Sequence, residues 1–413
     1  MVHLYIDPGT GSMLFTILIG VIGAAIYFFR NLFMKLKFFI SGGKVEKSAD
    51  KIPFVIYSDH KRYWNVFEPI CDEFERRGVD VVFYTSSEDD PALSKNYEHV
   101  KCEFIGEGNK AFAKLNMLNA SVLLATTPGL DVYQWKRSKD VDYYIHIPHS
   151  PSDILTYRMF GLDYYDAILV NGAFQGDQVR QLEAIRNIKK KEIEIVGLPY
   201  MDRMIQQLKA AKPLEKNDEI TVLVAPSWGK SAILGKYGEK FLDAILKTGY
   251  HIIVRPHPQS YTSEKELIDN LQKKYPNSDQ LEWNRDNDNF EVLRKSDIMI
   301  SDFSGVIFDF VLVFDKPIIY ADTSFDSSPY DAWWVDGPIW SFEVLPRLGN
   351  QLKETDFDRM KELIDDGISS SYFTEERQKV REECWQYQGL GAQKTVDYML
   401  HKYEQLSNTE ENK

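Results

Sequence analysis

The stretch from Asp297 to Asp322, DIMISDFSGVIFDFVLVFDKPIIYAD, decides the fold. Its residues 298–300 form a short apolar run of the kind that a buried parallel strand shows. Residues of the turn and N-cap type come next, ahead of an apolar helical stretch: Ser301, Asp302, Ser304 and Gly305. Pro317 then separates the predicted helix from a second predicted strand, 318–320. Because helix N–H groups meet the end of a strand here, this turn is a candidate phosphate site, although most such turns are only structural.

The composition of the 413-residue chain is that of a globular protein with room for two α/β domains. A net charge of −13 argues against nucleic acid as a partner, but a local basic pocket could still bind a phosphorylated ligand. The cysteines lack metal-ligand spacing and are predicted to be buried free thiols in a reducing compartment: Cys71, Cys102 and Cys384. We therefore expect no required cofactor and no essential divalent metal.

From residue 52 onward, strand-like and helix-like patterns alternate, which predicts βαβ units with mostly parallel strands. The predicted strands form two series: 54–57, 79–85, 122–125, 143–147, 167–170 and 193–196, then 221–225, 251–255, 298–300 and 318–320. The predicted helices are 64–77, 174–188, 239–247 and 263–275, with a charged helical stretch over 357–405.

These patterns predict two Rossmann-like domains in a GT-B-type arrangement, with ligands in the cleft between them, although alternation alone fits many α/β folds. The predicted parts are a first domain over 52–208, a connection over 209–219, a second domain over 220–400 and a polar tail over 401–413. The first predicted strand is not followed by GxGxxG and the chain has no Walker A motif, which argues against NAD enzymes and P-loop NTPases.

The N-terminus carries an uncharged, mostly apolar run of 18 residues, Ser12 to Phe29. We expect a membrane anchor over 1–40 with a transmembrane helix at about 12–30, followed by a linker over 41–51. Basic residues follow the run, and the positive-inside rule then gives a single-pass protein of the cell membrane with its bulk in the cytoplasm. A cleaved signal peptide or a buried core helix are the alternatives, and residues 33–40 could continue as an interfacial helix.

Several polar residues stand where predicted strands end. His149, in YIHIPHSPSD, could take a proton from an attacking hydroxyl, whereas His146 on the opposite side of the strand is expected to be structural. Arg255 and His257, in HIIVRPHP, could hold a diphosphate. The alternatives are a hydrogen-bonded loop histidine and a proline-braced turn. A further strand ends in APSWGK, which offers phosphate-binding candidates, with core packing as the alternative for the tryptophan: Ser227, Trp228 and Lys230.

Together, SDFSGVIFDF with DKPIIY, APSW, RPHP, the His149 segment and GLPYMD resemble the motifs of the CDP-glycerol glycerophosphotransferase family, which builds teichoic-acid-like polymers. The resemblance covers roughly residues 145–322. The chain departs from the family pattern at four positions: Ser150 for Gly, Tyr200 for Arg, Gly229 for Arg and Gly305 for Ser. Asp202 is expected to cap the helix that it begins. Asp309 could face the cleft or cap a network, and Glu291 matches a nucleotide-contacting region only loosely.

The resemblance implies transfer of glycerol phosphate, or a related polyol phosphate, from CDP-glycerol to a hydroxyl of a membrane-linked acceptor, with release of CMP. The first domain would bind the acceptor and the second the nucleotide donor. His149 and His257 would be the catalytic residues, and Arg255 and Ser304 would help to hold the phosphates. Two alternatives remain open: a GT-B glycosyltransferase that uses a nucleotide sugar, and a membrane-tethered assembly protein whose site has decayed.

Overall fold

The computed structural model describes residues 51–214, 219–286 and 288–411. Residues 52–413 group into one compact unit. The expected anchor at 12–30 and most of the expected linker lie outside the described residues. Within the described part of the chain, no helix combines the length and the apolar character that a membrane crossing requires.

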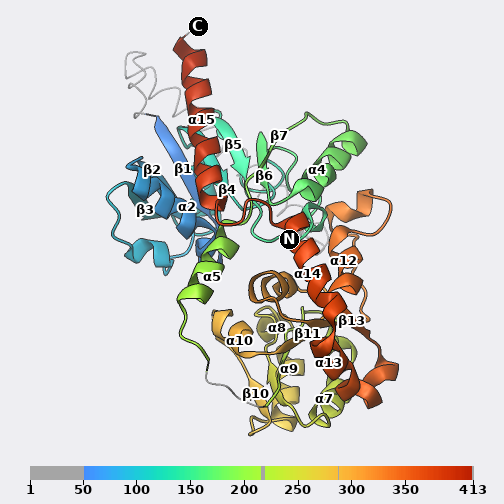
Figure 1. Cartoon of the computed structure of the whole chain (residues 1–413). Helices are drawn as coiled ribbons and strands as arrows, with labels where there is room; N and C mark the ends of the chain where they lie inside the picture. Colours follow the sequence, from blue (N-terminus) through green and yellow to red (C-terminus); the bar gives the residue numbers. More distant parts are fainter. Residues whose placement is uncertain (1–50, 215–218, 287, 412–413) are drawn as a thin grey trace, which may run out of the picture. The chain divides into compact units, whose positions relative to one another are not determined.

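Seven parallel strands form the first sheet, in the order β3-β2-β1-β4-β5-β6-β7 (Figure 1). Their bounds are β1 Ile52–Ser58, β2 Val81–Thr85, β3 Val100–Phe104, β4 Ala120–Ala125, β5 Val141–His146, β6 Ala167–Val170 and β7 Glu192–Ile195. The six strands predicted from the sequence are confirmed within a few residues at each end. The missed strand, β3, lies at the sheet edge, where its sequence VKCEF is only partly buried and lacks an apolar run.

Six parallel strands form the second sheet, in the order β10-β9-β8-β11-β12-β13. Their bounds are β8 Thr221–Val224, β9 His251–Val254, β10 Leu281–Trp283, β11 Ile298–Ser301, β12 Ile318–Ala321 and β13 Gly349–Leu352. The sequence did not predict β10 or β13. Gly349 resembles a turn residue, yet it pairs with Ile318, and a Cβ there would lie 1.9 Å from the Ile318 carbonyl oxygen. Glycine is needed for this close approach of two strands.

Helices cover both sheets, as a doubly wound fold requires. They are α2 Trp64–Arg77, α3 Asn109–Leu115, α4 Ala173–Arg186, α5 Pro199–Ala210, α6 Ile233–Lys236, α7 Gly238–Leu246, α8 Ser260–Ser263, α9 Lys265–Lys274, α10 Phe290–Lys295, α11 Val306–Phe308, α12 Trp340–Leu348, α13 Met360–Ser369, α14 Ser371–Cys384 and α15 Gly391–Glu411. The cysteines are free as predicted; two are buried and Cys102 is only partly buried.

The last helix, α15, corrects two predicted boundaries. It packs against α2, α5 and β4, so it belongs with the first sheet and not with the second domain (Figure 1). Tyr403 of α15 lies 5.1 Å from Phe54 of β1 between ring centroids, and Lys402 pairs with Glu192 at 2.7 Å. The predicted polar tail from residue 401 is therefore wrong, because the helix continues through Glu411.

Asp202 holds the beginning of α15 in place. Its carboxylate accepts hydrogen bonds from the backbone N–H groups of Gly389 at 2.6 Å and Gly391 at 2.8 Å, and from the Trp385 indole at 3.1 Å. The expectation that Asp202 caps its own helix, α5, is wrong: it caps a helix almost two hundred residues later in the chain.

Candidate active site

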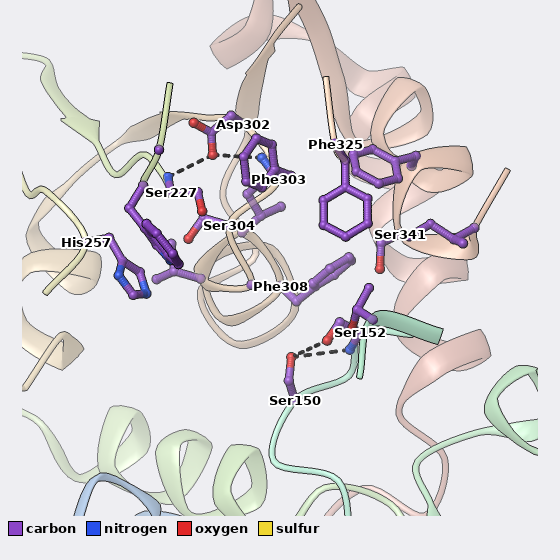
Figure 2. Close-up of a pocket in the computed structure, with 18 of the residues that line it drawn as sticks. Ser150, Ser152, Ser227, His257, Asp302, Phe303, Ser304, Phe308, Phe325 and Ser341 are labelled. Carbon is purple, nitrogen blue, oxygen red and sulfur yellow. Dashed lines mark hydrogen bonds between the residues drawn. The ribbon is translucent and has the colours of Figure 1, made fainter. Parts of the chain in front are cut away.

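A cavity of about 650 Å³ lies between the loops at the carboxyl ends of the two sheets. Its first wall, from the loop after β5 and from α5, includes His149, Ser150 and Tyr200. Its second wall comes from the loops after β8, β9 and β11: Ser227, Trp228, Lys230, His257, Asp302, Ser304 and Gly305. Figure 2 shows Ser227, His257 and Ser304 gathered on one side of this space, with Ser150 and Ser152 on another loop. The volume is in the usual range for a small-molecule site.

Asp302 organises the second wall through its carboxylate. It accepts backbone N–H hydrogen bonds from Ser227 at 2.8 Å and Phe303 at 2.8 Å (Figure 2), and also from Ile233 at 3.0 Å. The residue is buried, and burial raises the pKa of its carboxyl above the ordinary value. Because both oxygens are engaged, Asp302 positions the loops after β8 and β11. It is a positioning residue, where a ligand-binding role had been predicted.

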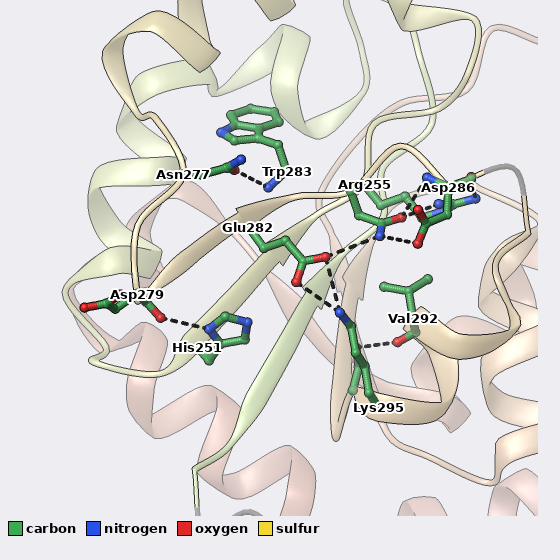
Figure 3. A network of polar contacts seen from close by, with 11 residues as sticks. His251, Arg255, Asn277, Asp279, Glu282, Trp283, Asp286, Val292 and Lys295 are labelled. Carbon is green, nitrogen blue, oxygen red and sulfur yellow. Dashed lines mark hydrogen bonds and ion pairs between the residues drawn. The ribbon is translucent and has the colours of Figure 1, made fainter. Parts of the chain in front are cut away.

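Ser301 and Arg255 do not line the cavity, contrary to the prediction for both. The Ser301 hydroxyl is buried and donates to the Ala225 carbonyl at 2.7 Å, which ties β11 to β8. The Arg255 guanidinium bonds the Asn284 side chain and donates to the Asp286 carbonyl at 2.8 Å (Figure 3). Arg255 therefore stabilises the loop after β10, and its charge is directed away from the cavity wall.

His257 has a defined tautomer. Its Nδ1 accepts the backbone N–H of Gln259 at 3.1 Å, so the ring proton of the neutral imidazole is on Nε2. Burial, and next the charge of Arg62, lower the pKa of His257 below its ordinary value. His257 thus offers one neutral N–H donor. Lys230 adds a cation, and it makes no ion pair within the part of the chain that the structure describes.

Trp228 lies at the rim of the cavity and is 45% exposed. Core packing, the alternative for this residue, is therefore wrong. Glu291 is also exposed; it pairs with Arg294 at 2.8 Å and does not line the cavity. The loose assignment of Glu291 to a nucleotide site is therefore unsupported by its position.

His149 lies on the first wall with few contacts. Its Nδ1 is 3.5 Å from the Thr126 hydroxyl, and its ring lies 4.9 Å from the Tyr63 ring between centroids. Burial, and next the charge of Arg62, lower the pKa of His149 to about 4, which keeps the imidazole neutral at pH 7. In the Nδ1–H tautomer, which the Thr126 hydroxyl can accept from, the lone pair of Nε2 is available to accept a proton.

His146 is structural, as expected. It is fully buried, and its Nε2 is hydrogen bonded to the Tyr157 hydroxyl at 3.0 Å. Burial lowers the pKa of His146 well below its ordinary value. The two histidines of one short segment are therefore separated by their environments, because His146 is enclosed and His149 lines the cavity.

Arg62 is a basic residue that the sequence analysis missed. It lies in a short 3-10 turn, Lys61–Tyr63, and the ring of its neighbour Tyr63 lies 4.9 Å from that of His149. Arg62 does not line the cavity, but its charge lowers the pKa values of both His149 and His257. The guanidinium stacks on the Tyr63 ring at 5.1 Å and has no carboxylate partner among the described residues. A free guanidinium beside a neutral histidine from each wall favours an anionic ligand. No motif marks Arg62; only the fold brings it to the site.

Asp309 faces the cavity, as the sequence suggested. The helix that follows β11 has one α-helical turn, α11, and then a π-helical turn over Asp309–Val313, so it is shorter and less regular than predicted. The Asp309 carboxyl accepts from the Tyr200 hydroxyl at 3.0 Å and from Asn289 at 3.3 Å, and burial raises its pKa to about 6. This contact joins α5 to the second wall.

Two of the departures from the family pattern face each other. A Cβ placed on Gly305 would lie 3.5 Å from the Ser150 hydroxyl oxygen, an ordinary contact distance. Gly305 has φ −60° and ψ −20°, a conformation open to any residue, so its backbone does not require glycine. The serine expected on the second wall is thus absent, and a serine hydroxyl stands opposite on the first wall.

Comparison with solved structures gives the fold class. The chain is similar to the UDP-GlcNAc 2-epimerase of Methanocaldococcus jannaschii, with a TM-score of 0.55, 12% identity, 85% of this chain covered and 100% of that one. It is also similar to a glycosyltransferase of Rickettsia africae, with a TM-score of 0.50, 11% identity, 86% covered and 99% of that chain. The protein has two Rossmann-like domains with GT-B-like neighbours, as predicted.

A family model then defines the family. The model of the CDP-glycerol:poly(glycerophosphate) glycerophosphotransferases matches residues 163–401, more than half of the chain, so the protein belongs to this family of transferases. It is 28% identical to the minor teichoic acid biosynthesis protein GgaB of Bacillus subtilis over 162 residues. That match covers 32% of this chain and 16% of the relative, so the chain spans a small part of the relative's length.

Proposed function

We propose that this protein transfers glycerol phosphate, or a related polyol phosphate, from CDP-glycerol to an acceptor hydroxyl, releases CMP and so extends a cell-surface polymer. One observation carries the proposal: the neutral His149 on the first wall and the donors of the second wall line a single cavity. The family and the teichoic acid relative support the same reaction class.

In the proposed reaction, the acceptor hydroxyl gives its proton to Nε2 of His149 as its oxygen bonds to the β-phosphorus. The bond from the β-phosphorus to the bridging oxygen breaks, and that oxygen leaves on CMP. The Nε2–H of His257, the Ser304 hydroxyl and Lys230 hold the phosphates and offset the charge that develops. Arg62, outside the cavity lining, adds positive potential. The loops are already fixed by Asp302, so little reorganisation is needed when the donor binds.

We also propose that the acceptor is membrane-linked and that residues 12–30 anchor the chain with its bulk in the cytoplasm. The apolar run and the basic residues that follow it support this proposal. Fractionation with alkaline carbonate tests it, because an anchored chain stays in the pellet. Full release into the soluble fraction would contradict it.

The reaction is tested by release of CMP from CDP-glycerol in parallel with a panel of UDP- and GDP-sugars, with and without a chelator. We expect turnover of CDP-glycerol, none of the nucleotide sugars, and no loss on chelation. Turnover of a nucleotide sugar alone would favour a glycosyltransferase. Calorimetry with CDP-glycerol and CMP distinguishes an active site from a decayed one, because a decayed site binds neither compound. His251→Ala is a matched control, because His251 bonds the Asp279 carbonyl away from the cavity (Figure 3).

A further inference from the structure

A second cavity, of about 400 Å³, opens beside the loop that follows β4. Its walls include three aromatic side chains, Phe112, Tyr133 and Trp135, together with Thr127 and Arg158. Among the described residues that line it, Arg158 is the one that carries a charge. None of these residues takes part in the reaction proposed for the first cavity, so the purpose of this second cavity is open.

The loop conformation presents Tyr133 to this cavity. Gly129 has φ +89° and Asp131 has φ +63°, so the chain turns twice through the left-handed region. A Cβ on Gly129 would lie 2.2 Å from the Tyr133 ring, so only glycine lets the ring lie over the backbone there. Tyr133 remains 45% exposed, whereas Trp135 is buried against Tyr57 at 5.1 Å between ring centroids. Of the three aromatic rings in the walls, Tyr133 is therefore exposed, Phe112 is partly buried and Trp135 is fixed by burial.

Polar groups in the walls of this cavity have no partner. The Thr127 hydroxyl and the Trp135 indole N–H are buried without a hydrogen bond within the described part of the chain. The Arg158 side chain is exposed and forms no ion pair with the described carboxylates. A buried polar group without a partner typically costs about 1–3 kcal/mol, so such groups mark places where a ligand or water completes the bonding.

The second cavity adjoins the first through one short segment. Thr156 lines the first cavity and Arg158 lines the second, and two residues span at most about 7 Å. The segment is held by a bridge between Arg158 and Tyr330, and by the Asp331 N–H, which donates to the Tyr157 carbonyl at 2.8 Å. Tyr330 itself lines the first cavity. The two cavities therefore flank one short segment, and the proposal takes a ligand longer than one glycerol phosphate unit to reach both.

We propose that the second cavity is an acceptor subsite that binds a glycosyl phosphate, a sugar ring joined to a phosphate, next to the hydroxyl that is extended. The inference rests on the proposed function, because it takes the first cavity to hold the donor. A sugar ring presents C–H groups to the face of Tyr133. A small shift of the two buried side chains would let its hydroxyls pair with the Trp135 N–H and the Thr127 hydroxyl. The phosphate pairs with the guanidinium of Arg158.

The chemistry of this cavity differs from that of the first one. The first cavity has a histidine from each wall with Lys230 and Arg62 nearby, as a diphosphate requires, while the second has a single guanidinium, as a phosphodiester requires. Aromatic surface beside one cation favours a sugar ring that carries a phosphate over inorganic phosphate or glycerol phosphate alone. This difference sets the probes for the experiment.

The test is titration of the full-length chain with glucose 1-phosphate, followed by calorimetry and by tryptophan fluorescence, with glycerol 3-phosphate and inorganic phosphate in parallel. We expect glucose 1-phosphate to bind at roughly 1–10 mM, with the other two at least several-fold weaker. Tyr133→Ala and Arg158→Ala should each weaken binding about tenfold. Exposed residues on other faces provide matched controls that leave binding unchanged: Tyr372→Ala and Arg359→Ala.

Trp135→Phe separates a binding role from a structural one. The substitution keeps a large ring and removes an N–H that has no partner, so thermal stability should hold while glucose 1-phosphate binding weakens several-fold. CMP should not displace the sugar phosphate, because CMP is expected to bind in the first cavity. No binding to the wild-type chain, equal binding of inorganic phosphate, displacement by CMP, or no effect of the three variants would each overturn the proposal.

Failure of the proposed function would look different. A chain that neither binds nor turns over CDP-glycerol would contradict the donor assignment, while the titration with glucose 1-phosphate remains readable because it needs no donor. If the chain releases CMP from CDP-glycerol but binds no sugar phosphate, the proposed function stands and the acceptor subsite is contradicted.

Discussion

The two walls of the main cavity hold their groups in opposite ways. On the second wall, the Asp302 carboxylate accepts three backbone N–H hydrogen bonds, so the loops are fixed before any ligand arrives. On the first wall, His149 has one long contact, 3.5 Å to Thr126, and a ring neighbour in Tyr63. This difference fits the proposed division of labour, in which the second wall binds the donor and the first wall accepts a proton, and variants on each wall test it.

The largest effect is expected on the first wall. His149→Ala should lower kcat by about 10²–10⁴-fold, because general-base catalysis typically contributes that much. Affinity for CDP-glycerol should stay near that of the wild type, because the base contacts the acceptor. Steady-state kinetics with calorimetry on the same variant checks both points. Wild-type kcat, or a defect confined to nucleotide binding, would show that the walls do not divide the work in this way.

On the second wall, His257→Ala should lower kcat/KM for CDP-glycerol at least tenfold. The variant loses the Nε2–H donor that the Gln259 contact fixes, and a hydrogen bond to a charged group is typically worth about 1.5–3 kcal/mol. Circular dichroism should report an intact fold. His251→Ala controls for loss of a histidine, and an unchanged kcat/KM in His257→Ala would refute the assignment.

Two arginines sharpen the comparison further. Arg62→Ala should raise KM for CDP-glycerol about fivefold, the equivalent of roughly 1 kcal/mol for a partly exposed cation. Arg255→Ala should change KM less than twofold but lower the melting temperature, because Asn284 and the Asp286 carbonyl lose their donor. A raised KM with an unchanged melting temperature in Arg255→Ala would show instead that Arg255 binds the donor.

Variants of Ser150 and Gly305 test whether the hydroxyl on the first wall substitutes for the serine that the family has on the second wall. Gly305→Ser should lower activity a few-fold, because the new side chain would crowd the Ser150 hydroxyl, 3.5 Å from the Cβ position. Ser150→Gly should also lower activity, by loss of the hydroxyl. The double variant should recover most of the loss, which a double-mutant cycle measures. Additive losses would mean that the two positions act independently.

The smallest effect concerns pH. The pKa of His149 in the folded chain is about 4, below its unfolded value of about 6.5, so the unfolded state takes up the proton first. Stability from this group is therefore present above pH 6.5 and is lost as the pH falls toward 4. Urea unfolding at pH 7 and pH 5 should show a smaller loss for His149→Gln than for the wild type. An equal loss would mean that the imidazole is not held neutral.

Much of the fold was predictable because its signals are local. Apolar runs that end in turn residues predicted ten strands correctly, and the carboxyl ends of parallel strands share one sheet edge, so His149, His257 and Ser304 could be placed near a ligand. The three missed strands lack this signal: β3 is polar at an edge, β10 is only three residues long and β13 begins with Gly349.

The site was harder to predict because its details depend on distant partners. Arg255 has the right type and place in the sequence, yet Asn284 engages its guanidinium. Arg62 lies in no motif and reaches the site only through the fold. Asp302 has the composition of a ligand, but its oxygens accept backbone N–H groups from another loop. Sequence gives the residue type at a strand end, whereas the neighbours decide whether its charge is free.

The return of α15 to the first sheet has a consequence for how the chain is made. Phe54 is among the first described residues to leave the ribosome, yet its neighbour Tyr403 emerges near the end of translation. At about 5–20 residues per second, the first domain must wait roughly 10–40 s after its own strands are complete before α15 can cover them. During that time its exposed apolar face is open to aggregation and to chaperones, and a stop codon before Gly391 would leave it uncovered permanently.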